Sequence, residues 1–435
     1  MKKVVILVTL VVTGLAFLQI IPEFSIGSFS YKPVDLFSDL RPTSDDMGEG
    51  GFLSAASNEW PEGVVPFDDF SAQGPDSVRP HGMDKFYGKL AQRDRLPRPV
   101  RIAFYGDSFI ENDMLTADLR TQLQALYGGH GIGFVDIDNA TSENKTFVKT
   151  NNVGFECKNL IEDGFKHSMQ GISHHYAEAW GNAYIDVTVT DTCDVSYLFY
   201  HDASGISTQA SVNGSAVSAK HSVHDKMAVD EVSGRIRNMK WQISCSKALV
   251  YGTAFDSRKG VIVDNFGLKS NSGYYLKNIP MEILRSFADV RPYDMILICY
   301  GLNVVSAKQT TYTKFCDYLG QAIENFGAAF PDATIVVVGL PDRGTKKNGA
   351  VVSMGGIPEM SAQQREVAQK HRCVFWSLRD AQKALGGMEA MGNANPALIN
   401  KDYTHITHAG GKALAQCLTD AIDAGFKIYQ KKKKK

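Results

Sequence analysis

The sequence predicts an α/β domain with an inserted β-sandwich and an N-terminal membrane segment. Apolar strands alternate with amphipathic helices before residue 144 and again after residue 261, which is the pattern of a parallel sheet covered on both faces. Between these parts, residues 145–260 hold short β-rich runs, separated by turn residues and without a useful helical period. Such spacing favours a β-sandwich.

Composition is that of a globular protein and excludes some classes. The chain has 435 residues, a net charge of −1 and seven scattered cysteines without a C-x-x-C pair. The balanced charge argues against nucleic-acid binding by charge alone. The cysteine pattern argues against a zinc ribbon or a disulfide scaffold, although one bridge between Cys193 and Cys245 stays open.

The N-terminus predicts a membrane segment. Lys2 and Lys3 precede an uncharged apolar run at residues 4–21, long enough to cross most of a bilayer at about 1.5 Å per residue. Without a clear small-x-small cleavage site, residues 1–22 favour an uncleaved signal-anchor over a cleaved signal peptide. The lysines would then stay in the cytoplasm and the body would be exported.

Residues 23–95 read as a partly disordered tether, because they are polar and turn-rich around 41–51. Three phenylalanines and a helical-looking stretch at 83–92 predict that parts of this tether dock on the globular body. These phenylalanines are Phe67, Phe70 and Phe86.

The first α/β unit runs from a strand at 99–104 to a helix at 113–126. The helix carries apolar residues at helical spacing. These residues are Leu115, Leu119, Leu123 and Leu126. The Gly-rich run 128–133 follows this helix rather than opening one, so it predicts a helix stop before a second strand at 134–137.

The same alternation resumes after the insertion. Strands are expected at 294–300, 334–340 and 373–376, and helices at 312–326, 361–371 and 411–424, with Ser361 as a cap. The terminal lysines 431–435 predict a solvated, disordered tail, or alternatively a segment attracted to anionic polymers or lipid headgroups.

Ser108 occupies the turn between the first strand and its helix, at the carboxyl end of the strand, where open α/β sheets place their sites. A serine hydroxyl needs a base, and histidine with a carboxylate partner serves well near neutral pH. Asp402 and His405 are three residues apart just before the last helix, so they can meet locally. Asn303, after a buried strand, offers an amide to a developing oxyanion.

Three blocks in this order resemble the SGNH (GDSL-type) hydrolase family: Gly106-Asp107-Ser108, Gly301-Leu302-Asn303 and Asp402-Tyr403-Thr404-His405. The resemblance covers roughly 99–137 and 260–425. The remaining block is best matched at 265–273. Aligned on Gly267, the family's oxyanion glycine falls on Ser270, which is a departure that keeps the backbone N–H; Gly273 is the fallback donor.

The resemblance implies a flavodoxin-like three-layer α/β/α domain without metal or cofactor. Ser108 would be the nucleophile, His405 the general base and acid, and Asp402 the residue that orients it. The Ser108 amide, Ser270 and Asn303 would form the oxyanion hole.

The inserted module is similar in arrangement to the carbohydrate-binding-like module of bacterial peptidoglycan and polysaccharide O-acetylesterases. The expected domains follow in chain order, with the hydrolase split around the module. They are the hydrolase at 96–144 and 261–426, the module at 145–260 and a poly-Lys tail at 427–435.

Several other residues have competing interpretations. His408 is a rival base, and Glu111 with Asp113 could be an acid pair, although first-turn helix charges are the simpler reading. The His174-His175 pair and His221 with His224 lack metal-ligand spacing and are expected to be solvated loop histidines. Three aromatics of the module could stack on sugars, although core positions are more common. They are Trp180, Tyr184 and Trp241.

The predicted function is a membrane-anchored serine esterase of the bacterial envelope, periplasmic or extracytoplasmic, that removes O-acetyl groups from a carbohydrate polymer. Expected partners are the O-acylated polymer, the membrane through the N-terminal segment and envelope O-acetylation machinery, but not nucleic acid. One alternative is an O-acetyltransferase of the same fold. Another is a non-catalytic glycan-binding protein, which only Ser270 in place of glycine favours.

Overall fold

The computed structural model divides the chain into two units, residues 1–59 and residues 60–435. It describes residues 24–26, 29–31, 60–138, 145, 147–347 and 349–435. In the first unit this is a hairpin of β1 (Phe24–Ile26) and β2 (Phe29–Tyr31). The predicted membrane segment 4–21 lies outside the described residues. Within them, no helix combines the length and apolar character needed to cross a bilayer.

The larger unit is built around a six-stranded sheet, which we call the hydrolase sheet after the resemblance found in the sequence; five of its strands are parallel and β3 is an antiparallel edge strand. In spatial order the strands are β12 (Val261–Gly267), β4 (Val100–Gly106), β13 (Met295–Cys299), β14 (Thr334–Gly339), β17 (Val374–Ser377) and β3 (Asp68–Asp69). Numbered along the chain, the parallel strands follow the order 2-1-3-4-5 of flavodoxin-like folds. The predicted flavodoxin-like sheet is therefore confirmed.

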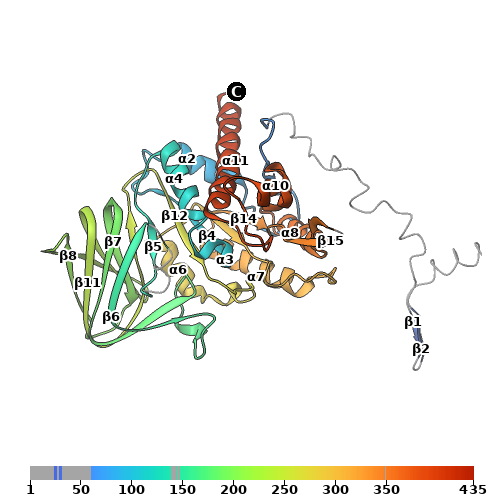
Figure 1. Cartoon of the computed structure of the whole chain (residues 1–435). Coiled ribbons are helices and arrows are strands. Elements are labelled where there is room, and N and C mark those ends of the chain that lie inside the picture. Colours follow the sequence, from blue (N-terminus) through green and yellow to red (C-terminus); the bar gives the residue numbers. More distant parts are fainter. Residues whose placement is uncertain (1–23, 27–28, 32–59, 139–144, 146, 348) are drawn as a thin grey trace, which may run out of the picture. The chain divides into compact units, whose positions relative to one another are not determined.

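Helices cover both faces of the hydrolase sheet (Figure 1). Every strand residue of β4 is buried, and alternate ones enter separate apolar clusters, as strand geometry requires. One face packs against α6 (Met281–Val290), α7 (Thr313–Ala329) and α8 (Ile357–Lys370). The other packs against α2 (Met83–Ala91), α4 (Thr116–Tyr127), α9 (Leu378–Ala384) and α11 (His408–Lys434).

The predicted helix at 113–126 divides into α3 (Ser108–Glu111) and α4, and Gly128 ends α4 with a φ of 78°. Leu115, Leu119 and Leu123 are buried as expected, but Leu126 is 51% exposed. At the end of α4 the neighbouring Tyr127 takes the buried position instead.

Residues 60–95 do not form a tether. β3 pairs with β17, and α2 packs against β14 and α11, so this stretch belongs to the body of the larger unit. The docking of Phe67, Phe70 and Phe86 is confirmed, because all three are buried. Polar composition was misleading here, since a few aromatic anchors hold a largely irregular segment in place.

The C-terminal part needs two corrections. α8 begins at Ile357, with Pro358 in its first turn, so Ser361 lies inside the helix rather than at its cap. The expected disordered tail is wrong, because α11 continues to Lys434 with its lysines exposed. Phe426 is buried and Tyr429 contacts Tyr87, so the apolar face extends further than predicted. Lysines at a helix C-terminus also suit its dipole.

The second sheet, which we call the β module, is seven-stranded and antiparallel. Its strands are β5 (Gly133–Val135), β6 (Val148–Asn159), β7 (His175–His201), β8 (Ser207–Val212), β9 (Ser215–Val217), β10 (Lys220–His224) and β11 (Met227–Asp256). Two long strands dominate, instead of the predicted regular short ones. Glycines and polar residues that resemble turns, such as Gly234 and Gly252, lie at register shifts inside β11.

The long strands make the β module curl. The N-terminal part of β11 pairs with β7 at residues 197–201, and its C-terminal part pairs with 195–199 from the other side. β5, predicted as the second strand of the hydrolase, pairs with β11 instead. The second strand of the hydrolase sheet is therefore β12, which lies beyond the whole insertion.

A buried ionic cluster joins the β module to the hydrolase sheet. Arg291 contacts Asp256 at 2.9 Å and Asp264 at 2.6 Å, and Arg101 on β4 contacts Asp256 at 3.0 Å. Tyr293 donates a 2.6 Å hydrogen bond to Asp264. Burial works to raise the pKa of Asp256, but the two guanidinium groups outweigh it and lower that pKa. The module is thus tied to the hydrolase sheet by buried charges.

The paired histidines at 174 and 175 are buried, which contradicts the expectation of solvated loop residues. His174 Nδ1 lies 2.9 Å from Gln170 Oε1, and His175 Nδ1 lies 2.9 Å from Ser173 O. All seven cysteines are free, so the possible bridge between Cys193 and Cys245 is absent.

Buried histidines should make the fold sensitive to acid. Burial lowers the pKa of His81 from 6.5 to about 4, and burial with the neighbouring His175 lowers that of His174 from 6.5 to about 3. Below pH 6.5 the unfolded chain therefore binds more protons than the folded chain, so the free energy of unfolding should fall until about pH 4. Each histidine contributes at most about 1.4 kcal/mol per pH unit.

Urea unfolding between pH 7.5 and 4.5 would measure this slope. The double variant His81→Gln/His174→Gln should flatten it, and an unchanged slope would contradict the assignment. Asp113 should not contribute in this range. Its pKa, which burial raises and Arg120 lowers, lies at about 2, so its stabilisation is lost only below about pH 4.

Candidate active site

Three strand ends meet at one edge of the hydrolase sheet. Gly106 at the end of β4 is paired in register with Gly267 of β12 on one side and with Cys299 of β13 on the other. The loops that follow these strands carry Ser108, Ser270 and Asn303. The structure therefore brings together, side by side, three of the predicted site residues at the point where the strand order reverses.

Ser108 begins α3 and is partly exposed. Asp107 caps this helix, with Oδ1 accepting a 3.0 Å hydrogen bond from Phe109 N. Burial raises the pKa of Asp107 to about 6, although the Phe109 N–H and the nearby His405 work to lower it. The charge of His405 therefore acts on the Asp107–Ser108 turn.

Asp402 and His405 form a local pair in the loop before α11. Asp402 Oδ2 lies 2.7 Å from His405 Nδ1, and Oδ1 accepts from the backbone N–H groups of Thr404 at 2.9 Å and His405 at 3.1 Å. The loop is closed by a β-bridge between Ile399 and Ile406, which are both buried. Burial works to raise the pKa of Asp402, but the hydrogen bonds from His405 and the backbone outweigh it and lower that pKa.

The side chains of Asp402 and His405 are about half exposed, at 49% and 53%. No hydrogen bond joins Ser108 to His405 in the part of the chain that the structure describes. Such bonds are often long before a substrate binds and tighten in the complex. The pair is therefore oriented internally, and proton transfer requires that Ser108 and His405 come within hydrogen-bond distance.

Asn303 is fixed by two acceptors. Its Nδ2 donates to Asp107 Oδ2 at 3.2 Å and to the carbonyl of Asn271 at 3.1 Å. These bonds tie the loop after β13 to the serine turn and to the loop after β12. An oxyanion that accepts a hydrogen bond from the Asn303 amide must therefore share it with one of these two acceptors or displace that acceptor.

The choice between Ser270 and Gly273 as the backbone donor is clearer in the structure. Gly273 N already donates to Asn271 Oδ1 at 2.9 Å, and a side chain there would collide with Tyr300. Ser270 N and Ser108 N have no partner among the described residues. Ser270 also has a φ of 59°, the left-handed conformation that favours glycine. Ser270 therefore combines an unpartnered N–H with a backbone conformation that glycine adopts more easily.

This geometry predicts the effect of Ser270→Gly. Turnover should stay within about threefold of wild type, because the backbone N–H remains, and the protein should gain about 1 kcal/mol, because the left-handed strain is relieved. Kinetics on p-nitrophenyl acetate and urea unfolding would measure both. A loss of turnover above tenfold would instead give the Ser270 hydroxyl a role.

A buried network that the sequence did not reveal supports the serine turn. Asn265 Nδ2 donates to the carbonyl of Ile110 on α3 at 2.8 Å and to Asp113 Oδ1 at 3.0 Å, while its Oδ1 accepts from Gly267 N at 2.8 Å. Arg120 pairs with Asp113 at 3.2 Å. In the sequence, this network is indicated only by polar residues that stand within apolar segments.

The structure also bears on two alternatives that the sequence left open, an acid pair near Ser108 and His408 as the base. Asp113 is 6% exposed and paired with Arg120, so it cannot act with Glu111 as an open acid pair. His408 begins α11, beside Asp118 on α4. Burial raises the pKa of Asp118, although Lys412 and His408 work to lower it.

The suggested sugar platform of three aromatics is not assembled. Trp241 is fully buried, whereas Trp180 is 46% exposed and faces Lys247, with the ammonium 5.7 Å from the ring.

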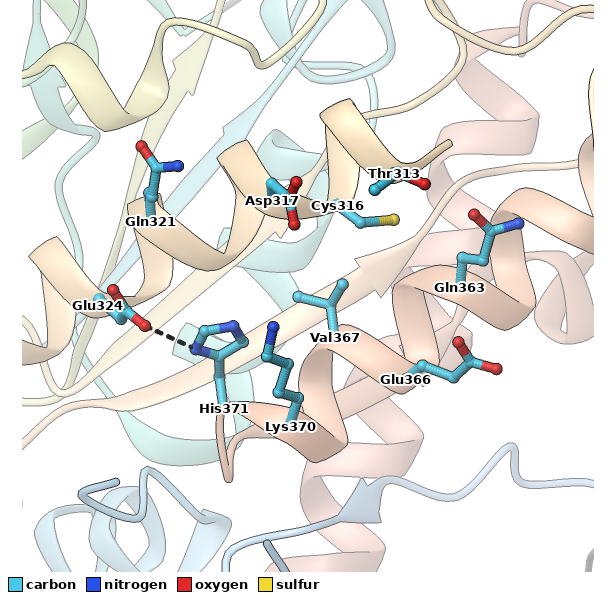
Figure 2. Close-up of a pocket in the computed structure, with 10 residues that line it drawn as sticks. All are labelled: Thr313, Cys316, Asp317, Gln321, Glu324, Gln363, Glu366, Val367, Lys370 and His371. Carbon is cyan, nitrogen blue, oxygen red and sulfur yellow. Dashed lines mark ion pairs between the residues drawn. The ribbon is translucent and has the colours of Figure 1, made fainter. Parts of the chain in front are cut away.

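A separate cavity of about 460 Å³ lies between α7 and α8 (Figure 2). It holds Cys316 and an ion pair between Glu324 and His371, at 3.4 Å, and none of the predicted site residues. Within the described ranges, no group of three or more His, Cys, Asp or Glu side chains could hold a metal ion.

The chain has a doubly wound α/β sheet with a serine at the switch point and an Asp–His pair in the last loop, an arrangement that resembles the SGNH type of α/β hydrolase. No protein-family model matches the chain, and no curated sequence does. Among solved structures, a peptidoglycan O-acetylesterase superposes with a TM-score of 0.67 at 18% identity, over 83% of this chain and 99% of that one. At this identity the likeness establishes the fold.

Two acetyl xylan esterases resemble part of the chain. One from Geobacillus stearothermophilus gives a TM-score of 0.28 at 17% identity, over 38% of this chain and 73% of that one. The other gives 0.26 at 18% identity, over 37% and 80%. These scores are too low to add to the argument.

Proposed function

We propose that this protein is a serine esterase that removes O-acetyl groups from a carbohydrate polymer. The proposal is supported by Ser108 and unpartnered backbone N–H groups at one sheet edge, and by an internally oriented Asp402–His405 pair whose imidazole charge acts on the neighbouring Asp107. The likeness to a peptidoglycan O-acetylesterase, which spans 99% of that chain, supports an O-acetylated glycan as substrate.

In the proposed mechanism, Ser108 Oγ attacks the acetyl carbonyl carbon while His405 Nε2 takes the hydroxyl proton. Asp402 holds Nδ1 and stabilises the imidazolium. The N–H groups of Ser108 and Ser270 and the Asn303 amide stabilise the oxyanion. The C–O bond to the sugar then breaks, and the sugar oxygen leaves with the proton from His405. Water, activated by His405, finally releases acetate from Ser108.

The test measures acetate released from O-acetylated xylan and from O-acetylated peptidoglycan, with Ser108→Ala as control. Serine-dependent release of free acetate supports the esterase. Transfer of the acetyl group to an added oligosaccharide, without free acetate, would establish the transferase alternative. No acyl chemistry in either assay would leave the non-catalytic binding alternative.

We also propose that residues 4–21 anchor the protein to the cytoplasmic membrane, with the body outside, and that residues 145–260 form a β-sandwich. The lysine-flanked apolar run supports the anchor. The curled register of β7 and β11, with an apolar cluster of its own, supports the sandwich. Membrane fractionation of the full chain against a chain lacking residues 1–22 tests the anchor.

A further inference from the structure

The C-terminal end of α11 is a strongly basic surface that the proposed esterase reaction does not use. Residues 424–435 hold six lysines and no acidic side chain. These lysines are Lys427 and the run 431–435, and all of them are exposed. Asp423 is the last acidic side chain of the chain, and it pairs with Lys427. Positive charge therefore dominates this end of the helix.

The lysine run is part of the helix and surrounds its axis. α11 stays helical to Lys434, and about 3.6 successive residues complete a turn, so the side chains of 431–434 point to all sides. Upstream, Phe426 is buried and Tyr429 packs against Tyr87 of α2. Figure 1 shows the final turns of α11 extending beyond α2. The body thus covers the apolar face of α11, and the helix end presents charge alone.

The chain enters the larger unit beside this lysine end. Trp60 is the first residue of that unit, and its ring lies 6.4 Å from that of Phe67. A Cβ on Gly425 would lie 3.1 Å from the Trp60 ring and would collide with the Tyr87 hydroxyl, so glycine lets both side chains reach the helix. Lys431 follows about 9 Å further along α11. A membrane segment in residues 1–22 would therefore be connected to the body at the end that carries the lysines.

The candidate active site lies at the other end of α11. The helix begins at His408, shortly after the Asp402–His405 pair, and its 27 residues span about 40 Å. This unbroken helix separates the lysine end from the catalytic loop. A surface that holds the lysine end would leave the sheet edge with Ser108 facing away from it.

The chemistry and the place of the lysine end select its partner. Lysine ammonium groups are compact charges, and they are attracted to anionic lipid headgroups within about 8 Å at physiological salt. No acidic side chain after Asp423 would oppose this attraction. A second attachment through the proposed membrane segment would raise the effective concentration of lipid near this end. An anionic phospholipid surface fits both the charge and the connection of the chain.

We propose that the C-terminal end of α11 docks on anionic phospholipid of the membrane and holds the body upright, with the active site about 40 Å from the lipid. The N-terminal segment and the lysine end then form two attachments, whereas a single tether would leave the body free to turn. The inference extends the proposed membrane attachment, and it does not require Ser108 to be a nucleophile.

Lysine acetylation of the full chain on liposomes tests this docking. The liposomes contain phosphatidylcholine, either alone or with about 30% phosphatidylglycerol, and the reagent is an uncharged N-hydroxysuccinimide ester of acetate. Peptide mass spectrometry compares the run 431–435 with Lys412, an exposed lysine near the active-site end of the same helix. Because the lysine end can reach a liposome from solution, the comparison is valid whether or not residues 4–21 insert.

On the anionic liposomes in about 50 mM salt, acetylation of the run 431–435 should fall at least about fivefold relative to phosphatidylcholine alone, while that of Lys412 should change less than about twofold. In about 500 mM salt the difference should vanish, because salt screens exposed charges. Equal acetylation of the run on both liposomes at low salt would overturn the proposal. Protection of Lys412 together with the run would also overturn it, because α11 would then lie along the surface.

Two matched variants separate the helix end from total charge. Lys433→Gln/Lys434→Gln should reduce the protection of the remaining lysines at least about threefold. Lys149→Gln/Lys220→Gln removes the same charge from exposed positions of the β module and should leave the protection unchanged. An equal effect of both variants would contradict a specific role of the α11 end.

A soluble polymer tests the choice of partner. Polyglutamate, added in an amount that matches the charge of the anionic liposomes, should leave the protection in place. Loss of the protection would make an anionic polymer the preferred partner and would overturn the assignment to lipid. The lysine variants should hydrolyse p-nitrophenyl acetate like wild type, so a failed esterase and a failed docking surface give different results.

Discussion

Replacing Ser108 by alanine should lower kcat/KM for p-nitrophenyl acetate at least about 1,000-fold, because no other group supplies the attacking oxygen. Asp402 and His405 hold each other within their own loop, at 2.7 Å, so they should keep their arrangement in the variant. The loss should therefore appear in kcat, while unfolding in urea stays within about 0.5 kcal/mol of wild type.

Ser306→Ala is the matched control, because Ser306 is an exposed serine shortly after Asn303 at the same edge of the sheet. Its kinetics should equal those of wild type. A fluorophosphonate probe should add its mass to the peptide that contains Ser108 and to no peptide of the alanine variant. Wild-type turnover by Ser108→Ala would overturn the nucleophile, even if the fold comparison stands.

Replacing Arg291 by alanine should lower the free energy of unfolding by about 3–5 kcal/mol, the cost typical of an uncompensated buried charge. Arg291 is fully buried, and its side chain faces two carboxylates from different sheets. Without it, among the described residues, Asp264 keeps the hydrogen bonds from Tyr293 and Phe134 N, and Asp256 keeps Arg101. Urea unfolding at pH 7, followed by tryptophan fluorescence, measures the loss.

Arg291→Lys separates charge from geometry. An ammonium restores the charge but not the two forked contacts, so an intermediate loss is expected. Lys226→Ala is the exposed control, since the Lys226–Glu282 pair is more than half exposed and should contribute less than about 1 kcal/mol. A loss below about 1 kcal/mol in Arg291→Ala would mean that water reaches the cluster and that the two sheets are held together mainly by apolar contacts.

Sequence patterns were reliable where the physical cause is local. The strands at 99–104, 294–300 and 334–340 are continuous apolar runs, and such runs are buried on both faces whatever their partners. The Asp402–His405 pair could also be predicted, because a three-residue spacing lets the carboxylate reach the ring within one loop. Ser108 could be placed at a strand end because the apolar run before it and the helical spacing after it are also local patterns.

Other features depended on partners far away in the chain. The strand at 133–135 is apolar, like the strands of the hydrolase sheet, but it pairs with residues 253–255 of β11. Turn-like residues inside β7 and β11 became bulges, because the paired strand continues past them. His174 and His175 look like loop histidines until the β module covers them.

The sequence by itself therefore determined the fold class, the order of the catalytic blocks and the residue types at each strand end. Burial periodicity and short-range hydrogen bonds are properties of neighbouring residues. Only the tertiary structure decided which backbone N–H groups at this sheet edge stay without a partner among the described residues, and how Arg291 joins the two sheets. These features arise from contacts between residues tens to hundreds of positions apart, which leave no periodic signal in the chain.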